Sequence, residues 1–241
     1  MLAAEVRRIA GRRGSYWSAL LIGVGAVVLM VIIRIYQDGD AGGTELLDAM
    51  GPISLVATLM AVLVGALAGS YDTAQGTIRY LVMTGVPRHR LYATRVLGTA
   101  VATIICCVPA IVVGVVAAYV LHHNAFNDPT AGSVLGAIWA YLVNPVVYAL
   151  VSVGVGSLLR SNGAAIGVSL GFALGGGVIT GLVNAYLSES LSGYLLPAAA
   201  PIVASLDRHA ETPLVAAFVA LVAWLTLLVG AGLWRTLVDE Y

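Results

Sequence analysis

The 241-residue sequence is 60% hydrophobic and 10% charged, which excludes an ordinary soluble domain, because such domains carry roughly 25% charged residues. Its 12 basic and 12 acidic residues cancel, so neither nucleic acid nor a strongly charged surface is an expected partner. All the basic residues are arginines. The absence of lysine excludes a Walker A nucleotide site and Schiff-base chemistry on this sequence.

Six long apolar stretches organise the chain. Each is close to or above the roughly 18–20 residues that a helix needs to cross the hydrocarbon core. They are too long and too uniformly apolar for the strands of a membrane barrel. They cover Tyr16–Ile35, Pro52–Gly69, Leu97–Leu121, Val134–Leu159, Ala164–Tyr186 and Pro213–Leu233. The sequence therefore predicts an all-α integral membrane protein, with six transmembrane helices in a single domain over residues 1–241.

The arginines predict the orientation of these helices. Ten of them occupy alternate gaps between the apolar stretches: Arg7, Arg8, Arg12, Arg13, Arg79, Arg88, Arg90, Arg95, Arg160 and Arg235. The gaps in between are acidic or nearly uncharged. Because arginine and lysine gather in cytoplasmic loops, both termini are predicted to be cytoplasmic.

Residues 1–13 are predicted to form an amphipathic elbow helix before the first span, because Leu2, Val6 and Ile9 share one face. This helix would lie in the membrane interface and hold its arginines at the anionic headgroups. These arginines are Arg7, Arg8, Arg12 and Arg13. A disordered basic tail is the alternative. The first span is interpreted as a retained anchor, since the apolar core of a signal peptide is only ~7–15 residues long.

Two groups of residues were considered for metal or thiol chemistry. Cys106 and Cys107 are adjacent in an apolar run and point to different faces of a helix, so neither a disulfide framework nor a zinc site is predicted. The His122-His123 pair lies near an acidic residue, but two ligands are too few for a metal site. No metal site is therefore predicted.

The fifth span is rich in glycine. Gly167, Gly171 and Gly175 recur at every fourth residue, a spacing that lets two helix backbones approach closely. This face is predicted to pack on another helix or on a second subunit. The same run matches the serine-hydrolase elbow around Ser169, but that motif needs a strand–turn–helix context and a histidine partner.

Two connections have their own signals. Arg160–Gly163 predicts a tight cytoplasmic hairpin between the fourth and fifth spans. The segment Leu191–Leu206 is broken by Pro197 and Pro201, too short to span and too apolar for a free loop. It is predicted to be a re-entrant or interfacial element on the outer face.

The second to sixth apolar stretches contain no Asp, Glu, Lys, Arg or His. Proton- and ion-coupled carriers hold an ionisable residue at membrane depth, so this pattern argues against both classes and predicts an external energy source. The uncharged polar residues Thr58, Asn144 and Asn184 are candidates for a cargo path, or for hydrogen bonds between helices.

The connection Ser70–Arg95 is the most distinctive segment. Its apolar positions predict an amphipathic helix, broken at Gly85 and Pro87, and a basic helix that starts at about Arg88 and leads into the third span. The side chains predicted to be exposed are Asp72, Gln75 and Arg79. A helix–break–helix with exposed charges favours the docking of a partner. The alternative is a plain positive-inside loop.

At this segment the chain resembles the ABC-2 type permeases, the membrane subunits of ABC exporters. The family pattern is an acidic residue, Gly-Thr-hydrophobic-Arg, a short hydrophobic stretch and Pro-x-Arg before the third span. Here it reads Asp72, Gly76-Thr77-Ile78-Arg79, Tyr80-Leu81-Val82 and Pro87-Arg88-His89-Arg90. The elbow helix, six spans and apolar outer segment extend the resemblance over essentially the whole chain. The basic residue often seen as lysine near the start of the third helix is Arg95 here.

The resemblance implies a permease subunit that works as a homo- or heterodimer with two copies of a separate ATP-binding subunit. That partner would hold ATP and Mg²⁺, and this chain would carry no cofactor and no catalytic site. The implied coupling residues are Asp72, Gly76, Thr77, Arg79, Pro87, Arg88 and Arg90. The expected cargo is amphiphilic or hydrophobic: a drug, an antimicrobial peptide or a lipid-like molecule.

Arginine in place of lysine, with abundant alanine and valine, suggests a GC-rich bacterial genome and hence a bacterial cytoplasmic membrane. Two other classes remain open. One is a membrane-embedded enzyme or enzyme-assembly subunit that uses Ser169 or the His122-His123 pair. The other is a passive channel or structural membrane protein.

Overall fold

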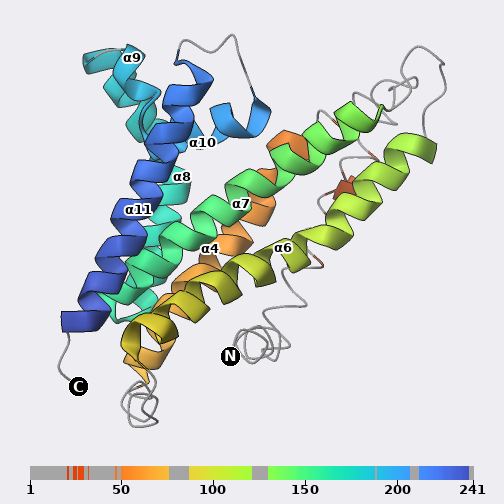
Figure 1. Ribbon diagram of the computed structural model, residues 1–241. Helices are drawn as coiled ribbons and strands as arrows, with labels where there is room; N and C mark the ends of the chain where they lie inside the picture. The colour runs from red at the N-terminus through yellow and green to blue at the C-terminus, as the bar shows by residue number, and fades with distance from the viewer. Residues whose placement is uncertain are drawn as a thin grey trace.

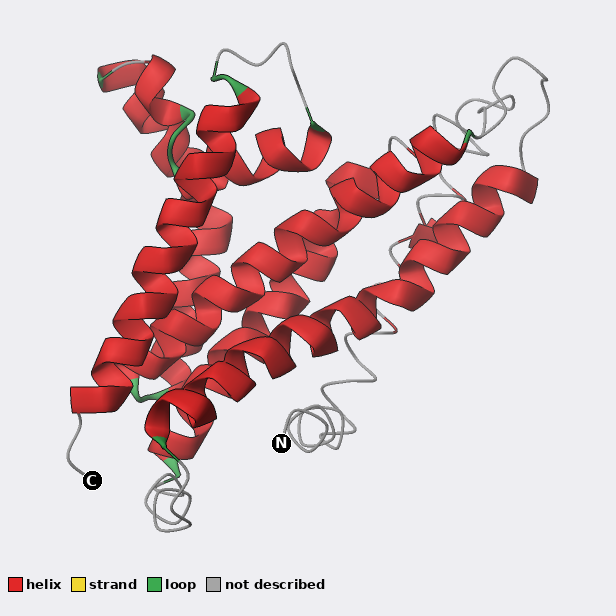
Figure 2. Cartoon of the chain, viewed as in Figure 1, coloured by secondary structure: helices red, strands yellow, loops and turns green. Residues whose placement is uncertain are grey.

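The computed structural model describes residues 50–75, 87–120, 130–187, 189–206 and 212–238, together with residues 21, 24, 25, 27–29, 32 and 47. This part of the chain is helical, with short turns and no strand (Figures 1 and 2). The helices are α4 (Met50–Ala74), α6 (Arg88–Val120), α7 (Ala131–Leu159), α8 (Asn162–Tyr186), α9 (Glu189–Ser192), α10 (Leu196–Ser205) and α11 (Leu214–Val238). The predicted all-α class is confirmed for these residues.

Five helices, α4, α6, α7, α8 and α11, are long and apolar enough to cross a membrane. They correspond to the second to sixth predicted spans. The first predicted span, Tyr16–Ile35, is described only at scattered positions from 21 to 32, and the elbow helix over residues 1–13 lies outside the described residues. Six spans and the cytoplasmic orientation of the termini therefore stay predictions.

Helix boundaries follow the local sequence. The basic helix predicted to start at about Arg88 does begin there and runs without interruption into the third span. Thr130 caps α7 through a reciprocal pair of hydrogen bonds with Ser133, which satisfies amide groups that the first helical turn leaves unpaired. The predicted tight turn is confirmed, since Arg160 ends α7 in a left-handed conformation and α8 begins at Asn162.

Glycines bring α4 and α7 into close backbone contact at the centre of the bundle. A β-carbon added at Gly65 would collide with the carbonyl of Ala149, and one added at Gly156 would lie 2.6 Å from the Ala66 carbonyl oxygen. Gly69 meets the backbone of α7 in the same way, at Val153. Small residues are what permit such contacts between helices, so α4 and α7 form the inner pair of the bundle.

The glycines of α8 are placed differently. A β-carbon added at Gly167, Gly171 or Gly175 would meet nothing within 4 Å, so this face packs on no other helix among the described residues. The prediction that this face packs on another helix or on a second subunit therefore stays a prediction. The most apolar part of α8 is only 11% buried, against 61% for α7. Consequently α8 presents most of its surface outward.

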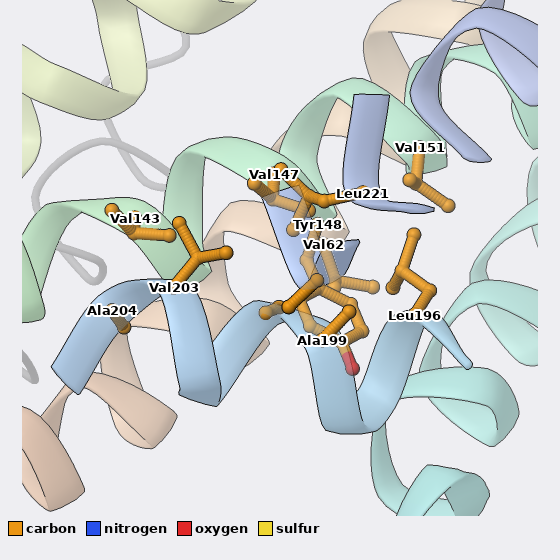
Figure 3. Packing of buried hydrophobic residues seen from close by; sticks show 12 residues of the cluster. Val62, Val143, Val147, Tyr148, Val151, Leu196, Ala199, Val203, Ala204 and Leu221 are labelled. Atoms are coloured by element: carbon orange, nitrogen blue, oxygen red, sulfur yellow. The ribbon is translucent and has the colours of Figure 1, made fainter. Parts of the chain in front are cut away.

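The predicted outer segment, Leu191–Leu206, contains a short helix, α10, packed into the bundle. Its buried residues, among them Leu196, Ala199 and Val203, gather against Val147 and Tyr148 of α7 (Figure 3). The indole of Trp139 in α7 donates a hydrogen bond to the Val203 carbonyl at 2.9 Å. α10 is therefore held by both apolar contacts and a polar anchor.

The long helices converge at one end and separate toward the other, where α10 lies between α7 and α11 (Figure 1). We call the converging end, which holds Asp72 and Arg95, the arginine end; the sequence predicts it to face the cytoplasm. We call the opposite end, which holds Thr130 and α10, the cavity end.

Candidate functional site

A buried ion pair joins the two helices that flank the predicted coupling segment. The Arg95 guanidinium Nη2 donates to the Asp72 carboxylate Oδ2 at 2.7 Å, and the two residues are 5% and 3% exposed. Asp72 lies in the last turn of α4 and Arg95 in the second turn of α6. Residues 76–86, which connect these helices, lie outside the described residues.

The predicted exposure of Asp72 is wrong. The length of α4 explains its burial: α4 continues five residues beyond the predicted span, to Ala74, and carries Asp72 beside Arg95 rather than into solvent. A carboxylate out of water requires a partner, and Arg95 supplies it. Gln75, one residue past the helix, is exposed as predicted.

Backbone and hydroxyl groups complete this site. Arg95 Nη1 donates to the Gly69 carbonyl at 3.3 Å, and Ser157 of α7 donates to the same oxygen at 3.4 Å. Ser70 donates to the side-chain oxygen of Asn162, the first residue of α8, at 2.8 Å. The end of α4 is thus tied to α6, α7 and α8.

The start of α6 is tied in turn to α11. The hydroxyl of Tyr92 donates a hydrogen bond to the Val229 carbonyl at 2.8 Å. Nη1 of Arg88 donates a longer one, 3.4 Å, to the Leu237 carbonyl. A movement of the first turns of α6 must therefore displace α4 and α11 together, since all three share these contacts.

The other predicted coupling residues differ in exposure. Pro87 and Arg90 are exposed at the start of α6, and Arg88 is partly exposed. Gly76, Thr77 and Arg79 lie outside the described residues, as do the elbow arginines Arg7, Arg8, Arg12 and Arg13. The role of these residues in docking an ATPase stays a prediction.

The cavity end holds a second candidate site, a cavity of about 720 Å³ between α4, α7 and α10. Its α7 wall runs from Ser133 through Gly136 and Ala140 to Asn144. The other walls are formed by Leu47, by Ser54 and Leu55 of α4, and by the end of α10 at Pro201, Ile202, Ala204, Ser205 and Leu206. All the described lining residues are uncharged, and most are aliphatic.

Of the three predicted cargo-path residues, only Asn144 lines this cavity. Its amide nitrogen donates a long hydrogen bond, 3.4 Å, to the Ser54 hydroxyl, while its buried oxygen Oδ1 has no partner among the described residues. Thr58 is buried one turn from Ser54 and donates to the Ser54 carbonyl at 2.8 Å. Asn184 is exposed near the end of α8, away from the cavity.

Of the alternative enzymatic residues, the structure describes only Ser169. Ser169 is buried in the middle of α8, without the strand and turn of a hydrolase elbow, and its hydroxyl bonds to no described residue. His122 and His123 lie outside the described residues. Among the residues that the structure places, no group of three or more His, Cys, Asp or Glu could hold a metal ion.

Sequence reasoning missed the ion pair, although it singled out both residues. Asp72 and Arg95 lie close to the ends of two consecutive predicted spans, at either end of the connection between them. Their opposite charges could therefore have predicted that they contact each other. The cavity left no signal of its own in the sequence, because its walls are ordinary aliphatic positions of three separate helices.

Comparison with curated proteins finds none that matches this chain. A family model does match it over residues 16–233, which include every helix from α4 to α10 and most of α11. That family is described as "Protein of unknown function (DUF2705)". The chain belongs to the DUF2705 family.

Proposed function

We propose that this chain is the membrane subunit of an ABC exporter, driven by ATP that a separate subunit hydrolyses. The observation that supports this proposal most is the ion pair between Asp72 and Arg95. These two residues stand at opposite ends of the segment that resembles an ABC-2 coupling region. A docking segment transmits force only if its ends are fixed to the helices that must move. The buried ion pair fixes them.

The contacts around the pair supply the mechanical path. Closure of two ATP-binding subunits would push on the segment between residues 75 and 88, and Asp72 and Arg95 would pass that displacement to α4 and α6. Through Gly69, Ser70 and Tyr92 the same displacement reaches α7, α8 and α11. The bundle would then alternate between states open to opposite sides of the membrane.

In this proposal the basic residues at the start of α6 make the ionic contacts with the ATPase. Arg90 is exposed there and can pair with a carboxylate of a partner. Arg88 is partly exposed and already donates to the Leu237 carbonyl, so it would contribute to this surface as a second positive charge. Arg79 would add to the same surface. Arginine suits this role because its charge is permanent and its planar group forms paired hydrogen bonds.

The remaining features follow the resemblance. The protein would lie in the bacterial cytoplasmic membrane with both termini inside, as a dimer with an identical or a related permease chain. ATP and Mg²⁺ would bind only to the two partner subunits. The uncharged spans support an amphiphilic or hydrophobic cargo, because a charged one would lack compensating groups at membrane depth.

The test is expression of the tagged chain in its native cells, followed by purification through the tag and identification of the proteins that co-purify. A soluble ATPase should co-purify, and the complex should hydrolyse ATP. Changing Arg88 and Arg90 together to alanine should reduce the amount of co-purified ATPase at least tenfold. Arg235→Ala, which removes a charge from the same end of the bundle but outside the coupling segment, is the matched control. Absence of any ATPase in the purified complex would exclude this function.

A further inference from the structure

The described lining of the cavity between α4, α7 and α10 carries no charge. None of these residues is ionisable, so a charged group placed against them would gain no counter-ion from them. Its volume of about 720 Å³ falls within the roughly 300–1,000 Å³ of sites that hold drug-sized ligands. The lining therefore favours a mostly aliphatic molecule.

One group in the cavity is not satisfied by the protein. The buried Oδ1 of Asn144 accepts no hydrogen bond from a described residue, and a buried polar atom in that condition costs about 1–3 kcal/mol. Thr103 and Ser169 also hold unpaired hydroxyl oxygens, but neither residue lines the cavity. Asn144 is thus distinguished by combining an unused acceptor with a place in the cavity wall.

The position of Asn144 sets where a ligand's polar end would lie. It follows Ser133, Gly136 and Ala140 along one face of α7, near the middle of the helix, so it closes the deep end of the wall. Because Oδ1 itself is buried, the amide must rotate about its broad terminal torsion to present this oxygen to the cavity, and that rotation exchanges the long hydrogen bond to Ser54 for one to the ligand. An aliphatic body would then lie along Gly136 and Ala140.

Gly136 leaves this wall open. A β-carbon added there would meet nothing within 4 Å, although the residue faces a cavity enclosed by three helices. Space is therefore available at the level where the body of the ligand would lie. The same fact makes the position suitable for a substitution that fills the cavity without straining the backbone.

We propose that this cavity binds an uncharged single-chain amphiphile whose polar end donates an N–H hydrogen bond to Asn144. The inference rests on the proposed function in one respect, since the ligand of a transport subunit would be its cargo. Binding itself requires no ATPase. It can therefore be measured on this chain alone.

The probe is dodecanamide with a diazirine in its alkyl chain, photo-crosslinked to the full chain in phospholipid nanodiscs. Cross-links should map to α7 between Gly136 and Asn144. Excess dodecanamide should displace the probe at least tenfold better than methyl dodecanoate, which has the same chain but no N–H donor. Because nanodisc lipid is in large excess, a cavity that takes any acyl chain would give no specific labelling.

Two variants and one control complete the test. Gly136→Leu should reduce labelling at least tenfold, and Asn144→Leu should abolish the preference for the amide over the ester. Gly177→Leu is the control, because Gly177 in α8 also has open space around it but does not line the cavity. Equal competition by amide and ester, labelling elsewhere, or full labelling of the Gly136→Leu variant would each overturn the proposal.

The outcomes separate this inference from the proposed function. Intact ATPase binding without amide-selective labelling would refute the cavity as a ligand site, and the proposed ABC exporter function would be unaffected. Amide-selective labelling without any associated ATPase would establish the cavity as a ligand site and exclude the exporter assignment.

Discussion

The two ends of the helical bundle are built on opposite principles. At the arginine end, glycines bring helix backbones into contact, and a buried ion pair joins α4 to α6. At the cavity end the helices separate and α10 fills part of the opening (Figure 1). The Asn144 amide oxygen at this end has no hydrogen-bond partner among the described residues. One end is organised for rigidity and the other leaves room.

The difference indicates where such a protein can change shape. Close backbone contacts cannot accommodate a change in side-chain volume, because removing or adding one carbon atom there forces neighbouring helices to shift. A cavity tolerates side-chain rearrangement at little cost. In an alternating transporter, the arginine end would move as a unit and the cavity end would change its shape.

Loss of Arg95 should have the largest effect on stability. Arg95→Met leaves the Asp72 carboxylate buried without a counter-ion, and breaking a buried pair in this way costs about 3–5 kcal/mol. The measurement is the free energy of unfolding in detergent, from denaturant titration of helical circular dichroism.

The double variant Asp72→Leu with Arg95→Met sharpens this test. Because it removes both charges, it should recover most of the lost stability. It should nevertheless lose ATPase stimulation if the pair transmits force. A single variant as stable as the wild type would show that the pair contributes nothing at this end.

A side chain at Gly69 should have the next largest effect. Gly69→Leu drives carbon atoms into the backbone of α7 at Val153, and overpacking of this kind costs about 1–3 kcal/mol. Denaturant titration in detergent measures this loss of unfolding free energy. Gly177→Leu makes the same change where space is open, and should leave the free energy of unfolding within about 0.5 kcal/mol of the wild type. Equal effects at both positions would refute the contrast between packed and open glycines.

These two sites also show what the sequence could and could not predict. Helix positions followed from apolar length, and the start of α6 at Arg88 followed from Gly85 and Pro87, which interrupt one helix and let the next begin. Glycine spacing identified a surface of small residues on α8, but spacing does not say which neighbour covers it. The close contacts formed instead through Gly65 and Gly69 of α4.

The polar sites were harder to predict for a related reason. Asp72 was assigned to the docking of a partner and Arg95 to the basic start of the third span, because each was read within its own segment. Their contact depends on how far α4 continues and how α6 enters the bundle. The cavity depends on the divergence of three helices and on the depth at which α10 packs. Neither quantity is encoded in a local pattern.

The anchor of α10 should have a moderate effect. Trp139→Phe removes the hydrogen bond to the Val203 carbonyl and should destabilise the packing of α10 by about 1 kcal/mol, with most of the aromatic contact retained. Hydrogen exchange of the α10 amides should become faster, while exchange in α4 stays unchanged. Trp234→Phe, on an exposed face of α11, is the control. Unchanged exchange in α10 would mean that the apolar contacts alone hold it.

Substitution of Asn144 should have the smallest effect on the free energy of unfolding, and the direction of that change is informative. Asn144→Leu removes an unsatisfied buried amide and one weak hydrogen bond, so the free energy of unfolding should stay level or rise by about 1 kcal/mol. A residue whose removal leaves the fold intact is retained for another reason, and ligand binding is the reason that the cavity offers. If Asn144→Leu instead destabilised the protein as strongly as Arg95→Met, Asn144 would be a structural residue. The cavity end would then be organised for rigidity, like the arginine end.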